Sequence, residues 1–206
     1  MNLSTMNKQI IFVDSSVQDY QSLIQGIDPA QIVILNENLS GIEQITNALA
    51  NQQDIEAVHI LSHGSPGSLK LGADVLNEKD IENFSTGIKQ WGNALTENGD
   101  IHLYGCDVAA GETGIKFVKE LSELTKADVA ASNNITGNAE LGGDWNLEVE
   151  TGTIETSIPF NSESLKTYSH ILATANPDTK AVTVNSPSVS IDVLANDTAI
   201  GRASVQ

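Results

Sequence analysis

The stretch VHILSHGSPG, residues 58–67, joins a short apolar run to a histidine, a glycine and a series of turn-forming residues. The stretch IHLYGC, residues 101–106, has the same design and ends at a glycine and a cysteine. Runs of this length between turn signals are typical of strands that are buried on both faces. The two stretches therefore predict neighbouring strands of a sheet that is covered by helices.

Segments on either side of these two strands extend the pattern. Apolar runs at residues 9–14, 31–36 and 127–132 predict three more strands. The segments between the strands carry apolar residues at helical spacing, with a helix start expected near Asn77 and an apolar face formed by Ile115, Val118, Leu121 and Leu124. SLKLGADVL, residues 68–76, predicts a small hairpin that turns at Gly72 and Ala73. Alternating strands and helices indicate an α/β fold, a three-layer α/β/α sandwich with a mainly parallel sheet of five or six strands.

The composition changes after the predicted sandwich. Residues 1–172 form the expected α/β domain, whereas residues 173–206 are rich in Thr, Asn, Pro and alternating Val. This second part predicts a linker and the unfinished start of a separate β module, so we expect the chain to be part of a longer protein. The linker HILATANPD, residues 170–178, is exposed by composition and is a candidate region for self-cleavage.

Charge excludes several functions. Lys and Arg number 10 against 27 Asp and Glu, which gives a net charge of -17. Such a chain is repelled by nucleic acid and by anionic membranes, so we expect neither as a partner. No apolar stretch reaches the length of a membrane span, and the apolar run near the N-terminus is too short for a signal peptide. Export through a C-terminal signal on a longer chain is left open.

Polar side chains stand where the two signature strands end. His63 follows one strand and Cys106, the only cysteine, follows the other. Parallel sheets place their functional sites beyond the carboxyl ends of the strands, and neighbouring strands lie about 4.8 Å apart. A histidine beside a thiol can take its proton and turn it into a nucleophile. The sequence therefore predicts a Cys-His dyad, which needs no cofactor.

Two glycines next to the dyad add to this prediction. Gly64 and Gly105 leave room for a substrate backbone, and the N–H groups of Gly64 and Cys106 are candidate donors to an oxyanion. Asp14, at the end of the first strand, falls on the same rim. The loops after the strands are expected to form the substrate pocket, with the candidate residues Ser132, Asn133, Asn134 and Asp14.

Three simpler interpretations compete with the dyad. A lone cysteine after an apolar strand is often a buried structural residue. A zinc site built from His59, His63, His102 and Cys106 is disfavoured, because positions four apart on a strand are separated by about 13 Å. Finally, both glycines can simply end their strands.

The order of the motifs resembles the caspase-like (clan CD) cysteine peptidases, in which one apolar strand ends in His-Gly and a later one ends in Gly-Cys or Ala-Cys. The resemblance implies that His63 is the general base or acid, that Cys106 is the nucleophile, and that the N–H groups of Gly64 and Cys106 form the oxyanion hole. Asp107 follows the cysteine here and no Gln-Ala-Cys precedes it, so a preference for cleavage after Asp does not carry over.

Three longer motifs, HILSHGSPGSLKLG, LYGCDVAAGETG and LGGDWNLE, are together similar to domain-of-unknown-function family 4347 over about residues 8–172. That family occurs near the N-termini of very large cyanobacterial and proteobacterial surface or secreted proteins, so we expect a bacterial, cyanobacterial source for this chain. VSIDVLANDT resembles the opening strand of the cadherin-like and Ig-like repeats of bacterial adhesins. This similarity implies an extracellular or cell-surface location, with the cytoplasm left open, and calcium either as an activator or bound by Asp192, Asn196 and Asp197.

Two functions follow from these resemblances. The first is a cysteine endopeptidase that cuts its own parent chain or neighbouring surface polypeptides. The alternative is a catalytically silent caspase-like domain that serves as a structural or docking module of an adhesin, since a fold does not fix an activity.

Overall fold

The computed structural model describes residues 8–28 and 31–173 of the 206-residue chain. Of residues 173–206, where a linker and an incomplete β module are expected, only Ala173 is described. The calcium ligands predicted at Asp192, Asn196 and Asp197 also lie outside them. The description below therefore concerns the α/β domain.

A six-stranded sheet forms the centre of this domain, in the order β2-β1-β3-β7-β8-β9. The first five strands are parallel, and β9 at the edge is antiparallel to β8. The bounds are β1 Gln9–Asp14, β2 Ile32–Leu35, β3 Ile55–Leu61, β7 Leu95–Tyr104, β8 Asp128–Ala131 and β9 Val149–Glu150. The prediction of a mainly parallel sheet of five or six strands is confirmed.

The two signature strands, β3 and β7, are direct neighbours. Their register pairs His59 with His102 and Leu61 with Tyr104. All but one of the β3 residues are buried, because helices cover both faces of the sheet. The two strands therefore end at the same edge of the sheet, as the repeated design of the sequence predicts.

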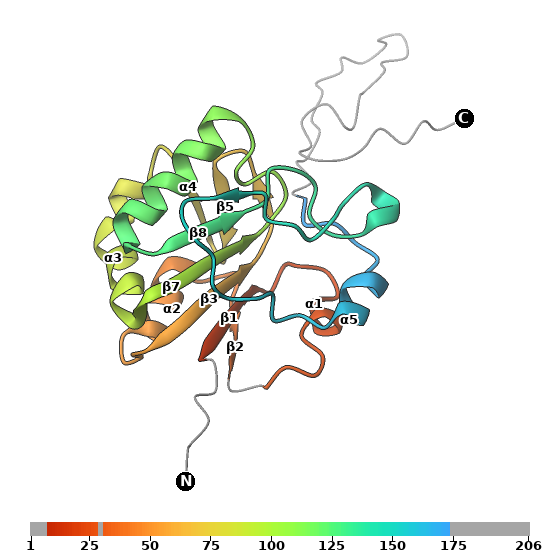
Figure 1. Ribbon diagram of the computed structural model, residues 1–206, viewed down its shortest axis with the longest axis horizontal. Helices are drawn as coiled ribbons and strands as arrows, with labels where there is room; N and C mark the ends of the chain where they lie inside the picture. Colours follow the sequence, from red (N-terminus) through yellow and green to blue (C-terminus); the bar gives the residue numbers. More distant parts are fainter. Residues whose placement is uncertain (1–7, 29–30, 174–206) are drawn as a thin grey trace, which may run out of the picture.

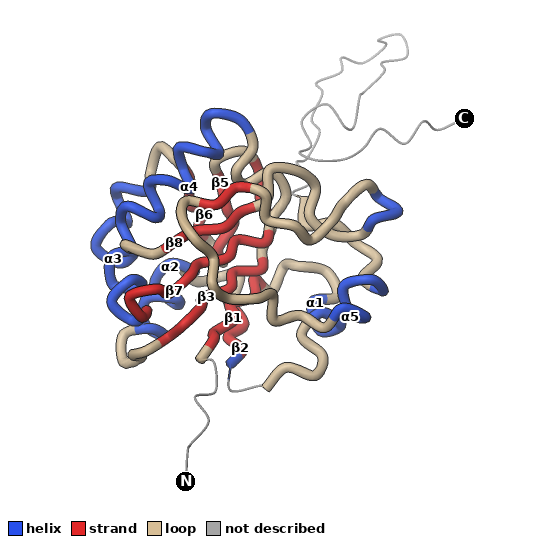
Figure 2. The backbone as a smooth tube through the Cα atoms, viewed as in Figure 1, coloured by secondary structure: helices blue, strands red, loops and turns tan. Residues whose placement is uncertain are grey.

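Helices lie on both sides of the sheet, in the arrangement of a three-layer sandwich (Figure 1). Figure 2 shows the strands in red between two groups of blue helices. One face packs against α2 Gly41–Leu49, α3 Ser85–Ala94 and α4 Gly111–Thr125, and the other against α1 Tyr20–Leu23 and α5 Ser162–Thr167. Alternate residues of β1 contribute to the two apolar clusters, as the pleat of a strand requires.

A small antiparallel sheet follows β3 directly. It contains β4 Gly64–Ser65, β5 Ser68–Leu71 and β6 Asp74–Asn77. The predicted hairpin turn at Gly72 is confirmed. Only glycine fits this position, because its φ is 60° and an added Cβ would lie 2.4 Å from the carbonyl oxygen of Leu39. Because the N–H of Lys70 donates to the carbonyl of His63 at 2.9 Å, this sheet also fixes the backbone of the predicted base.

Two helix predictions need correction. The helix expected to start near Asn77 starts at Ser85, because the chain first completes β6 and then forms a 3-10 turn over Ile81–Phe84. Ile115 is 53% exposed rather than buried. In α4 the buried side is centred on Phe117 and Leu121, which rotates the helix so that Ile115 faces outward.

Candidate active site

His63 and Cys106 each lie two residues beyond the end of a strand. β3 ends at Leu61 and β7 at Tyr104, and these two residues are paired in register. The histidine and the cysteine therefore leave the same edge of the sheet from adjacent strands. The sequence prediction that places both at one site agrees with this geometry.

Gly64 brings the two strand ends into direct contact. A Cβ atom built on Gly64 would lie 2.5 Å from Cγ2 of Val108 and 2.7 Å from the carbonyl oxygen of Cys106. Real side chains do not tolerate such distances, so only glycine lets the backbone after His63 lie against the loop that carries Cys106. The glycine thus does more than end a strand.

The backbone N–H groups of Gly64 and Cys106 point at the same oxygen atom. Both donate to the carbonyl of Leu172, with N···O distances of 3.2 Å from Gly64 and 3.4 Å from Cys106. Two N–H donors that converge on one carbonyl oxygen form the geometry of an oxyanion hole. The sequence predicted both donors, whereas it gave no signal for the carbonyl that they bind.

The His63 ring is held by one of its two nitrogens. Nε2 lies 3.2 Å from the carbonyl oxygen of Ser16, and because a carbonyl can only accept, Nε2 carries the hydrogen. When Nε2 alone carries a hydrogen, Nδ1 is left as an acceptor. Nδ1 is buried and has no hydrogen-bond partner among residues 8–28 and 31–173. The site thus contains an oriented imidazole with an unused basic nitrogen.

Asp14 supports this histidine indirectly. Its carboxylate accepts hydrogen bonds from the N–H groups of Ser16, at 2.9 Å, and Gly72, at 2.6 Å, and pairs with Lys70 at 3.3 Å. Burial alone would raise the pKa of Asp14, but these hydrogen bonds and the charge of Lys70 outweigh it and lower the pKa. Asp14 therefore reaches His63 through Ser16, and its side chain is fully buried.

The thiol of Cys106 is buried beside the backbone of Thr136. The Thr136 N–H lies 3.3 Å from Sγ, and Sγ lies 3.6 Å from the Thr136 carbonyl oxygen. Burial raises the pKa of the thiol to about 12, against hydrogen bonds from the backbone of Thr136 and Leu172 that lower it. No hydrogen bond joins His63 to Cys106 within the described part of the chain. The resting thiol is therefore protonated.

The predicted pocket residues 132–134 brace the loop after Cys106. The N–H of Asp107 donates to the carbonyl of Asn134, and that of Ala109 to the carbonyl of Ser132, both at 2.8 Å. The Asn133 N–H donates to the carboxylate of Glu148 at 3.0 Å. These residues lead directly into the segment 136–138, which contacts the chain around Leu172.

Two other histidines belong to the core. His59 and His102 stack with their ring centroids 4.5 Å apart, and His59 contacts Gln9 at 3.1 Å and the Tyr104 hydroxyl at 3.4 Å. Burial, with a further contribution from His102, lowers the pKa of His59 well below its usual value. Both rings are therefore neutral packing residues, in line with their omission from the predicted dyad.

One group of acidic residues could hold a cation. Carboxylate oxygens of Asp100, Asp128 and Glu155 lie within 4.8 Å of one another. Asp100 is fully buried; one oxygen accepts from the N–H of Thr156 at 2.9 Å, while the other has no partner in the described part of the chain. Oxygen ligands suit Ca²⁺ or Mg²⁺. Asp128 is the first residue of β8, so the group lies away from the strand ends that carry the dyad.

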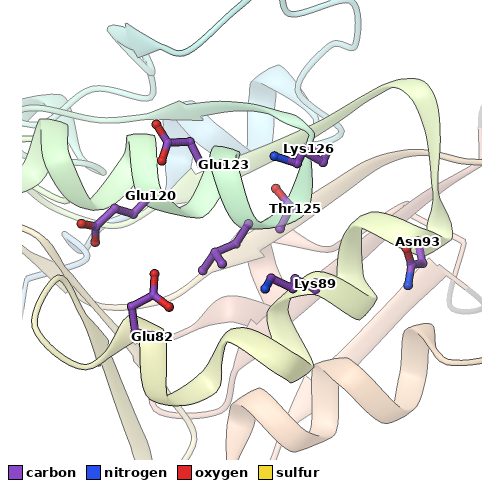
Figure 3. Close-up of a pocket in the computed structure, with 8 residues that line it drawn as sticks. Glu82, Lys89, Asn93, Glu120, Glu123, Thr125 and Lys126 are labelled. Atoms are coloured by element: carbon purple, nitrogen blue, oxygen red, sulfur yellow. The ribbon is translucent and has the colours of Figure 1, made fainter.

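A pocket of about 600 Å³ lies between α3 and α4 (Figure 3). Lys89 and Lys126 line it together with Glu120 and Glu123. None of the lining residues carries a thiol or an imidazole, and the pocket is formed by helices on the face of the sheet opposite to the cluster that contains Cys106. It is therefore separate from the dyad.

Fold and site together define an α/β domain with a thiol, an imidazole and two converging N–H groups at one sheet edge. The chain belongs to the family described as Domain of unknown function (DUF4347), whose model matches residues 10–172. The family similarity predicted from the three motifs is confirmed. No curated protein matches the chain significantly. Within the described residues, no helix has the length and apolar character to cross a membrane.

Proposed function

We propose that this domain is a cysteine endopeptidase in which His63 and Cys106 act as a dyad. The observation that carries the proposal is the convergence of the Gly64 and Cys106 N–H groups on one peptide carbonyl oxygen. A structural cysteine requires no such pair of donors, and it requires no neighbouring imidazole with an unpartnered buried nitrogen. The arrangement supports acyl transfer from a peptide to a thiol.

Each residue has a defined role in the proposed reaction. His63 takes the proton of the Cys106 thiol through Nδ1, and the thiolate attacks the carbonyl carbon of the peptide. The Gly64 and Cys106 N–H groups stabilise the negative charge on the carbonyl oxygen. His63 returns the proton to the leaving amine as the C–N bond breaks. Water then hydrolyses the thioester and restores the thiol.

Activity on other polypeptides requires a change at the thiol. Cys106 and Leu172 belong to the same buried apolar cluster, and burial is the main reason why the thiol pKa is high. When Leu172 moves away, water reaches the sulfur and the pKa falls towards its ordinary value. Removal of the thiol proton by His63 then costs less free energy. The proposed enzyme is therefore closed to other polypeptides as long as the Leu172 segment covers the thiol.

A second candidate is a catalytically silent docking or structural module. The observation in its favour is the protonated thiol, which has no hydrogen bond to His63 in the described structure. The wider proposals, a caspase-like relationship and a place in a large bacterial surface protein, draw their support from the sequence motifs and from the composition change after residue 172. An activating role for calcium stays a prediction.

The two candidates differ in their effect on a polypeptide substrate. We expect the full chain to cut denatured casein, faster with Leu172→Ala, and expect Cys106→Ala and His63→Ala to lower the rate at least about 100-fold. Lys119→Ala, on the exposed side of α4, is the matched control and should not change the rate. Equal fragments from wild type and Cys106→Ala would make the peptidase proposal wrong. A folded protein without any cutting would favour the docking module.

A further inference from the structure

The last described segment of the chain lies across the candidate active site. Residues 170–173, here called the strap, run antiparallel to residues 136–138 and form an isolated bridge between Ile171 and Gly137. The Leu172 N–H donates to the carbonyl of Thr136, and the Asn138 N–H donates to the carbonyl of His170, both at 2.9 Å. In Figure 1 the blue trace after α5 runs back to the loop that follows β8. Strand addition of this kind is a general way to bind an extended peptide.

The strap has a second backbone partner on its other side. Gly64 forms a parallel bridge with Ala173, through the hydrogen bond from its N–H to the Leu172 carbonyl. The chain is also shaped to admit the strap, because a Cβ on Gly137 would lie 2.5 Å from the carbonyl oxygen of His170. The strap is therefore held along both edges, as an extended substrate is held in a cleft.

Leu172 occupies the centre of this arrangement. Its side chain is fully buried in the apolar cluster that also contains Cys106, Tyr104 and Tyr168. Its carbonyl oxygen accepts from the N–H groups of Gly64 and Cys106. Its own N–H donates to the Thr136 carbonyl oxygen, which also contacts the thiol of Cys106. The carbonyl of Leu172 is thus the one that the oxyanion donors bind, and the sulfur lies beside the same residue.

We infer that the strap is the domain's own substrate and that the bond cut is the peptide bond between Leu172 and Ala173. The inference rests on the proposed function, and it adds the bond, the residue preferred before the cut and the intramolecular character of the reaction. Leu172 fills an apolar pocket, so the site selects a large aliphatic residue at this position rather than a charged one.

The reaction is a hydrolysis that consumes one water. Sγ of Cys106 forms a bond to the carbonyl carbon of Leu172, and the C–N bond to Ala173 breaks. The proton taken from the thiol by His63 passes to the new amino group of Ala173. Water adds hydroxide to the acyl carbon and a proton to the sulfur, which releases the Leu172 carboxylate and restores the thiol.

Proline at position 173 separates this inference from general effects on folding. The Ala173 N–H donates no hydrogen bond to another described residue, so a proline there removes none. Proline also favours an extended conformation in the residue before it, which is Leu172. Ala173→Pro should therefore leave the strap in place. The substitution Ala173→Pro turns the peptide bond to be cut into a tertiary amide, whose nitrogen belongs to the proline ring and carries no hydrogen. Ala173→Gly is the matched control, because it changes the same side chain and keeps an ordinary amide.

The experiment follows the full 206-residue chain over time by intact mass and N-terminal sequencing. We expect wild type and Ala173→Gly to yield a fragment that begins at residue 173, and expect Ala173→Pro and Cys106→Ala to slow its formation at least about 100-fold. Leu172→Met should retain cleavage and Leu172→Glu should lose it, with circular dichroism to show that each variant is folded. Absence of the fragment from wild type would overturn the inference.

An assay of casein cleavage by Leu172→Ala shows whether only the strap inference fails or whether the proposed peptidase function fails with it. If casein is cut in a Cys106-dependent way but the wild type is not cut between Leu172 and Ala173, the strap is not the substrate. The peptidase proposal would then stand. Absence of both reactions in folded protein would overturn the proposed function together with the inference. Cutting of the strap by Cys106→Ala at the wild-type rate would overturn both as well, because a contaminating protease would then account for the fragment.

Discussion

The backbone nitrogen of Gly64 lies 3.2 Å from the carbonyl oxygen of Leu172, although the two residues are far apart in the sequence. The same oxygen accepts from Cys106 at 3.4 Å. These distances are slightly longer than the hydrogen bonds that stabilise a full oxyanion, as expected for a neutral carbonyl. Four predictions test the contacts that create this relationship and those that surround it.

Substitution of Gly64 by Ala should damage both the site and the fold. The new Cβ would meet Val108 and the backbone of Cys106 below 3 Å, which we expect to cost about 1–3 kcal/mol of unfolding free energy. Displacement of the N–H donor should slow peptide cleavage at least about 100-fold. Gly26→Ala is the control. An alanine at its φ of 85° should cost about 1 kcal/mol of unfolding free energy, but the new Cβ would meet no neighbouring atom. Urea unfolding and cleavage assays measure the two effects, and equal activity in both variants would contradict the prediction.

Iodoacetamide should label Cys106 slowly in the wild-type chain. With the pKa of the thiol at about 12, the thiolate fraction at pH 8 is roughly 1,000-fold smaller than for an ordinary cysteine, and the rate should rise about tenfold per pH unit between pH 8 and 10. Leu172→Ala should uncover the sulfur and raise the rate at least about tenfold, in protein shown to be folded. In that background His63→Ala should lower it again. An unchanged rate on removal of His63 would count against the dyad.

Asp14→Asn should destabilise the domain and weaken its activity. The carboxylate holds the N–H groups of Ser16 and Gly72, so we expect a loss of about 1–3 kcal/mol at pH 7. The pKa of Asp14 is lowered on folding, so its stabilising effect is complete above about pH 3.8 and disappears as the pH falls through the folded-state pKa. The difference between wild type and variant should therefore shrink below pH 4. A constant difference between pH 7 and pH 3 would contradict this assignment.

Acid should destabilise the domain through His59. Its pKa is lowered well below the usual 6.5 on folding, so the unfolded chain takes up a proton first and stability is lost as the pH falls below about 6.5. The expected slope from this ring is up to about 1.4 kcal/mol per pH unit. His59→Gln should reduce the slope, and the difference between the two proteins should be constant above pH 7.5. Denaturant unfolding across the pH range measures it, and equal slopes below pH 6 would show that another group is responsible.

The sequence was sufficient to bring His63 and Cys106 to one sheet edge and to single out the two N–H groups beside them. His63 and Cys106 follow buried strands of the same design, and strand register then brings such ends together without further information. Glycine at position 64 also carries a sequence signal, because the close backbone approach excludes every other residue. These features depend on side-chain type or on its absence, which a sequence displays directly.

The remaining parts of the site were not predictable in this way. Ser16 holds His63 through its carbonyl, Thr136 contacts the sulfur through its peptide groups, and Leu172 accepts from two N–H groups through its carbonyl. Every residue has such backbone groups, so no residue type marks them. Although the linker from His170 was a candidate for self-cleavage, its composition did not show which bond faces the thiol. Ile115 illustrates the related limit for helices, because packing decides where the edge of the buried face of a helix lies.

The inferred cutting of the strap has a kinetic consequence. Because nucleophile and bond belong to one chain, the effective concentration of substrate is fixed by the fold and does not change with the amount of protein. Each molecule can cut its strap only once, after which the released end no longer returns as substrate. The half-time of cutting should then be the same at nanomolar and at micromolar concentrations of the chain. Such a domain reacts once, with a first-order rate constant. That rate constant is set by how often Leu172 and the sulfur adopt the reactive arrangement.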